Sequence, residues 1–159
     1  MNALLSILRY VLVSLEFLVC AAGAAAWFFF PSGLGWLSER IGSQAELLKY
    51  FGLLPVGLVV YDTTVVKIIL MPEADKRNAL QNWELYFDFK LGCIVGLAYA
   101  GIFALLGVSC LFFDWKAPEP YQSAFLLTSV VGAITVSATL YFAHIKIEEL
   151  FRKHSPPAP

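Results

Sequence analysis

The sequence predicts an all-α integral membrane protein, a four-helix bundle that forms one transmembrane domain. Two observations predict this class. Hydrophobic residues make up 59% of the 159 residues and charged residues only 14%, whereas charged residues make up about 25% of an average soluble domain. The apolar residues also gather in four runs, each long enough to cross a bilayer as a helix, which takes about 20 residues. This composition excludes a soluble globule and a disordered chain.

Each apolar run ends at a turn-forming or charged segment. Pro31, Ser32 and Gly33 follow the first run, and Pro72 follows the second. The first run is too long for a secretory signal, so we expect it to be retained as a span. The predicted spans cover residues 4–30, 47–71, 91–113 and 121–146.

Two loops are themselves predicted to hold structured segments. Residues 35–49 mix apolar and charged side chains, which is typical of a segment that lies on the membrane surface, here on the side away from the cytoplasm. Between the second and third spans, Pro72 can open a helix in which Leu80, Trp83 and Phe87 recur at helical spacing. We predict a short helix there, either anchored at the interface by Trp83 or offered to a cytoplasmic partner.

Lys and Arg residues are unevenly divided between the two sides of the predicted bundle. The side with both termini and the second loop holds Arg9, Lys67, Lys76, Arg77, Lys90, Lys146, Arg152 and Lys153, and the other side holds Arg40, Lys49 and Lys116. The positive-inside rule then places both termini in the cytoplasm, with the chain in a bacterial inner membrane or a plasma membrane. The net charge of −1 and the lack of a basic stripe exclude nucleic acid as a partner.

Small residues mark the predicted contacts between helices. One stripe in the third span consists of Gly92, Gly96, Ala100 and Ala104, and one in the fourth consists of Thr128, Gly132, Thr135 and Thr139. Lipid tails are as apolar as leucine, so helices associate where small side chains allow close approach. We expect both stripes to pack against helices, within one protomer or between protomers. Alternatively, the threonine stripe lines a narrow polar pathway in an oligomer.

Charged side chains inside a span are expensive and therefore have a partner or a function, and three of them are candidates for such a role. Asp62 is the deepest of them, Glu16 lies about two turns inside the first span, and Lys67 lies near the cytoplasmic end of the second. We interpret Asp62 as an interhelical hydrogen-bonding residue, for example to a threonine of the fourth span, or as a proton or cation site. Glu16 is interpreted as the partner of Lys67, with a role in ion traffic as the alternative.

Residue types that hold metals or cofactors are sparse. Cys20, Cys93 and Cys110 lie in apolar runs without a Cys-x-x-Cys motif, which indicates small buried hydrophobes. The two histidines are His144, at the end of the fourth span, and His154, in the tail. A haem anchor needs two well-placed axial ligands, so this reading of the bundle is disfavoured. We expect no cofactor, no metal site and no enzymatic activity.

These features favour an interaction protein, a small membrane subunit that anchors or senses for a soluble cytoplasmic partner. A bacterial stress or phage-defence pair would suit such a subunit. The candidate docking residues are Lys76, Arg77, Trp83, Arg152 and Lys153. Ile147, Leu150 and Phe151 indicate that the fourth helix continues past the membrane into this charged tail.

The alternative function is a homo-oligomeric ion channel, or a proton or cation pathway, that uses Asp62 and Glu16. A membrane enzyme or redox subunit has the weakest support, because no catalytic motif accompanies these carboxyl groups. In either leading case we expect the chain to work as a homo-oligomer in the lipid bilayer.

Overall fold

The computed structural model describes residues 14–71, 86–115, 117 and 119–154 of the chain. Within these residues it contains helices and no strand, which confirms the predicted all-α class. The helices are α2 (Leu15–Phe29), α3 (Pro31–Gly42), α4 (Ala45–Leu70), α6 (Tyr86–Cys110) and α7 (Pro120–His154). Residues 72–85 of the short helix predicted between the second and third spans lie outside the described residues, and its Phe87 lies in the first turn of α6.

The described helices are long and apolar enough to span a membrane, as the sequence predicted. Three candidate spans stand alone, at Leu48–Leu70, Tyr86–Cys110 and Pro120–Glu149. A fourth is present if the bent pair Leu15–Phe29 and Pro31–Gly42 is counted as one span. Helix α6, the third predicted span, begins five residues earlier than predicted, and α7, the fourth, ends eight residues later. Both helices therefore continue beyond their apolar runs.

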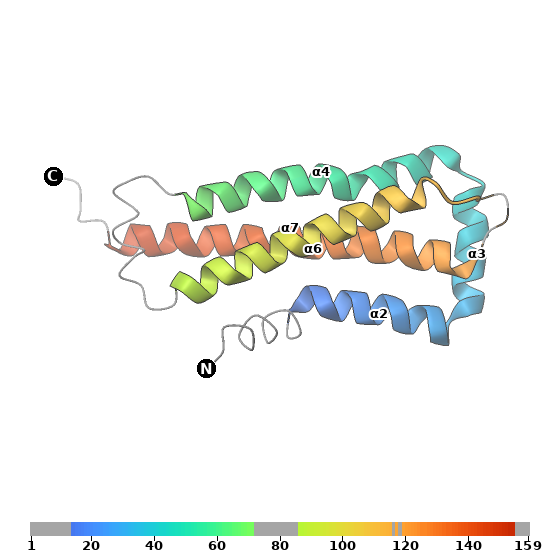
Figure 1. Cartoon of the computed structure of the whole chain (residues 1–159), viewed down its shortest axis with the longest axis horizontal. Coiled ribbons are helices and arrows are strands. Elements are labelled where there is room, and N and C mark those ends of the chain that lie inside the picture. The colour runs from blue at the N-terminus through green and yellow to red at the C-terminus, as the bar shows by residue number, and fades with distance from the viewer. Residues whose placement is uncertain (1–13, 72–85, 116, 118, 155–159) are drawn as a thin grey trace.

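The chain bends by 100° between α2 and α3, and α3 lies across one end of the bundle (Figure 1). Pro31 is the first residue of α3, where its missing N–H costs nothing because the first turn has no acceptor for it. Leu34 and Ser38, one turn apart, are buried against the bundle, whereas the side chain of Trp36 is 61% exposed. Of the segment 35–49 that the sequence placed at the membrane interface, residues 35–42 lie in α3, which starts earlier, and residues 45–49 begin α4.

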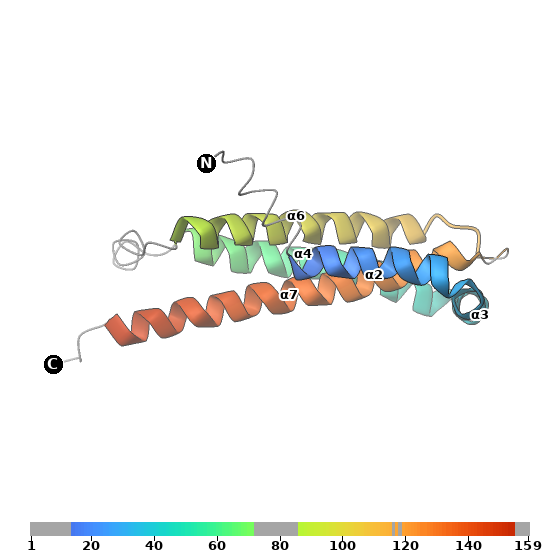
Figure 2. The same ribbon diagram turned by 90° about the horizontal axis from the view of Figure 1, so that it is seen from below.

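The core of the bundle lies between α4, α6 and α7, which pack extensively against one another, whereas α2 packs mainly on α7. Figure 2 shows α2 alongside the first half of α7. Helices α4 and α7 run in the same direction, and α2 and α6 run in the opposite one (Figure 1). The core is formed by large apolar side chains, among them Val66, Ile69, Phe103, Val136 and Leu140.

Glycines bring the backbones close at three points of this core. A Cβ added to Gly107 would lie 2.6 Å from the Gly52 carbonyl oxygen, so α4 and α6 touch there through their backbones. A Cβ on Gly132 would overlap the ring of Phe103, and one on Gly23 would overlap the side chain of Thr128. These contacts set the spacing of α2, α4 and α6 around α7.

The small-residue stripe predicted in the third span divides into two parts. Ala100 is buried, and a Cβ on Gly96 would make ordinary contact with Leu140 of α7, at 3.5 Å. Gly92 is exposed, and a Cβ there would meet no described atom within 4 Å, while Ala104 is partly buried. Close packing within the protomer therefore involves the middle of this stripe, and Gly92 faces outward.

Candidate intramembrane carboxyl site

Asp62 is the most deeply enclosed carboxyl side chain among the described residues, with 0% of its surface exposed. It lies on α4, eight residues before the last residue of that helix, Leu70, and thus about 12 Å from its end. Val65 and Val66 of the next turn are buried in the core. The buried face of α4 therefore carries a carboxyl group into an apolar helix interface.

The Ser137 hydroxyl of α7 lies beside the Asp62 carboxyl, close enough to interact with it. Neither Asp62 oxygen, however, has a partner with hydrogen-bond geometry, and neither does the Ser137 hydroxyl. A buried ionised carboxylate without a partner costs several kcal/mol of folding free energy. The sequence led us to expect a threonine of the fourth span as the neighbour of Asp62, but the structure puts Ser137 there.

No described cation compensates Asp62. The ion pairs among the described residues are His144 with Glu148 and Lys146 with Glu149. Lys67 is exposed, because five residues of helix turn it about 140° away from Asp62. The pairing expected between Glu16 and Lys67 does not form in the structure.

Glu16 is the second buried acidic residue, with 5% of its surface exposed, and lies in the first turn of α2. Helices α2 and α7 are antiparallel (Figure 1), and Gly23 of α2 meets Thr128 of α7. Glu16 lies seven residues before Gly23 on α2, and Thr135 lies seven residues after Thr128 on α7, so Glu16 and Thr135 are at the same level along the two helices. Asp62 is level with Ser137, so the two carboxyl groups lie at a similar depth on opposite faces of α7.

The threonine stripe of the fourth span uses its hydroxyl groups within its own helix. Thr135 donates to the Val131 carbonyl oxygen at 2.8 Å, and Thr139 donates to the Thr135 carbonyl oxygen at 2.9 Å. Thr128 instead packs on Gly23. The hydroxyls of Thr135 and Thr139 therefore bond within α7, and Asp62 has no threonine partner.

His144 completes a polar line on the face of α7 that carries Ser137. Seven residues, or about 10 Å along the axis, separate the two. The side chain of His144 is 26% exposed, and its Nε2 lies 3.6 Å from Glu148 Oε1. Its Nδ1 is buried without a hydrogen-bond partner. We did not predict Ser137 or His144 as site residues, although their spacing of seven was a signal that both share one helix face.

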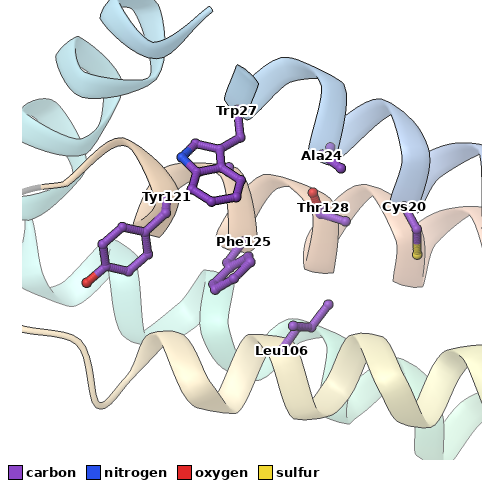
Figure 3. A pocket seen from close by; sticks show the side chains of 9 residues that line it. Cys20, Ala24, Trp27, Leu106, Tyr121, Phe125 and Thr128 are labelled. Atoms are coloured by element: carbon purple, nitrogen blue, oxygen red, sulfur yellow. The ribbon is translucent and has the colours of Figure 1, made fainter. Parts of the chain in front are cut away.

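A separate apolar pocket of about 240 Å³ lies between α2 and α6, over α7. Figure 3 shows Trp27, Leu106, Phe125 and Thr128 around it. It contains no ionisable group other than Cys20 and Tyr121. Among the described residues, no three His, Cys, Asp or Glu side chains gather as metal ligands.

The predicted docking residues lie at one end of the chain's fold or outside the described part. Lys76, Arg77 and Trp83 fall in residues 72–85, outside the described residues. Arg152 and Lys153 lie in the last turn of α7, far from α3 (Figure 1).

Comparisons with protein-family models, with curated proteins and with solved structures find no match to this chain.

Proposed function

We propose that this chain is a small membrane subunit that anchors or senses for a soluble cytoplasmic partner, with α7 as the connection. The length of α7 carries the proposal. Its 35 residues extend about 52 Å at 1.5 Å per residue, whereas the hydrocarbon core of a bilayer is about 30 Å thick. About 15 residues therefore remain outside the core, and Figure 1 shows α7 running past the end of α4.

The projecting part of α7 offers a surface of mixed chemistry. This part starts near Lys146, and Lys146, Glu148 and Glu149 have side chains that are 78%, 57% and 55% exposed. The pairs within the helix have distances of 3.6 and 3.8 Å. Exposed pairs of this kind contribute little to stability, so these charges are available to a partner.

The location that suits this proposal is a bacterial inner membrane or a plasma membrane, with the C-terminal end of α7 in the cytoplasm. The positive-inside rule supports this orientation, because eight of the 11 Lys and Arg residues lie on the side of the termini and the second loop. A helix that is continuous from the bilayer into the cytoplasm can transmit a tilt or rotation to a protein bound at its end.

An ion channel or a proton or cation pathway is the second candidate function. The buried, unpartnered carboxyl of Asp62 favours it. The same burial disfavours a pore between protomers lined by Asp62, because this side chain is enclosed within one protomer and lies beside its own Ser137. A pathway that uses Asp62 would therefore run inside the protomer.

Native mass spectrometry of a tagged copy, expressed at its natural level in its own host, tests the first proposal. We expect a complex that contains a second polypeptide beside the 17.6 kDa chain. Charge reversal at the end of α7, by Arg152→Glu with Lys153→Glu, should release that polypeptide. The matched control is Arg40→Glu, an exposed cation on α3 at the other end of the bundle, which should retain it. Masses at whole multiples of 17.6 kDa alone, in all three samples, would contradict the proposal.

A further inference from the structure

The unpartnered buried polar side-chain atoms of the described residues converge on one region. They are both carboxyl oxygens of Asp62, the hydroxyl of Ser137 and Nδ1 of His144. Buried polar atoms in folded proteins are almost always hydrogen-bonded to protein or to ordered water, so each exception calls for an explanation. Here the exceptions are adjacent or lie two turns apart on one face of α7, which indicates one shared cause.

The groups around Asp62 do not include a fixed cation. From α7, Ser137 lies beside it, and His144 is the next titratable residue on that face. From α6, Cys93 and Tyr99 belong to the same buried core, with Asp88 and Lys90 at the start of that helix. On α4 itself, Lys67 is exposed. Glu16 and Cys20 belong to α2, which packs mainly on α7.

We propose that Asp62 is a proton-binding site that exchanges its proton with solution through Ser137 and His144. A histidine ring has two nitrogens that can each accept or donate a proton, and His144 lies where α7 leaves the bundle, with Glu148 at 3.6 Å. An imidazolium at His144 gives up a proton and becomes neutral, and the Asp62 carboxylate gains that proton and becomes the acid. His144 then regains a proton from water, and release follows the same steps in reverse.

The distance between the groups sets what the path needs. Ser137 and His144 are about 10 Å apart along the helix, so the proposed path requires a chain of hydrogen-bonded water between them, with Ser137 as the last donor and acceptor before Asp62. At the His144 end, Nδ1 is buried and Nε2 lies 3.6 Å from Glu148 Oε1. The proton site lies within one protomer and exists whether or not a partner binds to α7, so it does not rest on the proposed anchoring function, and it names the groups that the second candidate function would use.

Infrared spectroscopy of the full chain in lipid nanodiscs tests this proposal, because a protonated carboxyl has a C=O band separate from the amide bands. We expect such a band in the wild type, its loss at high pH, and its absence in Asp62→Asn, which keeps the shape of the side chain. The matched control Asp88→Asn changes an exposed carboxyl and should leave the band in place. Ser137→Ala should shift the band, because it removes the neighbouring hydroxyl.

The role of His144 has its own readout, the rate at which the Asp62 band shifts after transfer into D₂O. We expect His144→Gln to slow this shift by about tenfold or more, since positioned proton-transfer groups contribute at least that much. A spectrum without a band that depends on Asp62, at any pH, overturns the proposal. An unchanged exchange rate in His144→Gln overturns the path through His144. Loss of the band on addition of Na⁺ but not of choline at constant pH would replace the proton site by a cation site.

Discussion

At the residue scale, the threonines of α7 and Asp62 of α4 differ in whether they have a hydrogen-bond partner. Thr135 and Thr139 donate to carbonyl oxygens of their own helix, whereas Asp62 has no partner with hydrogen-bond geometry. A hydroxyl can bend back to the carbonyl four residues earlier, but an ionised carboxylate has no proton to donate to it. The sequence showed that both kinds of residue lie inside apolar runs, but it could not show which helix face each one occupies in the packed bundle.

The identity of the neighbour of Asp62 illustrates this limit. The threonine stripe and Ser137 both lie on α7. Ser137 is only two residues from Thr135 and from Thr139, yet it lies on a different face of the helix. Periodicity groups the threonines correctly but does not say which face α4 covers. Which face of α7 is covered depends on how each helix is rotated, and close contacts such as Gly107 with Gly52 fix that rotation. These contacts involve single glycines that follow no sequence pattern.

Glycine substitutions separate packed from open positions at this scale. We expect Gly132→Ala to destabilise the fold by about 1–3 kcal/mol, the usual cost of overpacking a core, because the new Cβ overlaps the buried ring of Phe103. Gly92→Ala should be neutral or stabilise the helix by up to about 1 kcal/mol, because its Cβ meets no described atom. Unfolding of the purified chain in mixed micelles with increasing SDS measures both. Equal losses of stability would show that Gly92 is packed as tightly as Gly132.

At the element scale, the positions of the spans followed from run length, because a helix that crosses a bilayer needs about 20 apolar residues. The helix ends were less well predicted. Helix α6 starts at Tyr86 and α7 runs to His154, since leaving the apolar region removes no backbone hydrogen bond from a helix. Pro31 marked the end of the first run correctly, but the 100° bend that lays α3 across the bundle depends on contacts with distant residues.

Two serine hydroxyls fasten α3 to the start of α7. Ser38 donates to the Glu119 carbonyl oxygen and Ser123 donates to the Leu34 carbonyl oxygen, each at 2.8 Å. Ser38 and Ser123 are fully buried, each with 0% of its surface exposed. These bonds link segments more than 80 residues apart in the chain, and nothing in the local pattern of either segment predicts them.

Removing both hydroxyls should loosen α3 without unfolding the bundle. We expect Ser38→Ala with Ser123→Ala to cost about 2 kcal/mol in total, at about 1 kcal/mol for each hydrogen bond. Amide hydrogen exchange of residues 31–42 should then accelerate, while exchange in α4 and α6 stays as in the wild type. The control Ser109→Ala removes an exposed hydroxyl that bonds within its own helix, to the Leu105 carbonyl oxygen. Unchanged exchange in α3 would mean that its apolar contacts alone hold it in place.

At the scale of the whole molecule, the two ends of the bundle differ in chemistry. One end is closed by α3, with Trp36 and Arg40 in a cation–π contact at 5.6 Å, a pair that suits the membrane interface. The other end carries the projecting part of α7 with its charged side chains (Figure 1). The proposed soluble partner requires that this second end faces the cytoplasm.

Cysteine labelling in intact cells tests that orientation. Gly33 and Glu149 are exposed at the opposite ends, and a Cβ on Gly33 would meet no described atom within 4 Å, so Gly33→Cys and Glu149→Cys should both fold. The native Cys93 and Cys110 are buried, and the wild type measures the background from Cys20. A membrane-impermeant maleimide should label Gly33→Cys from outside and Glu149→Cys only after permeabilisation, because cations are retained on the cytoplasmic side. The reverse pattern would place α7 outside the cell, where a soluble cytoplasmic partner could not reach it.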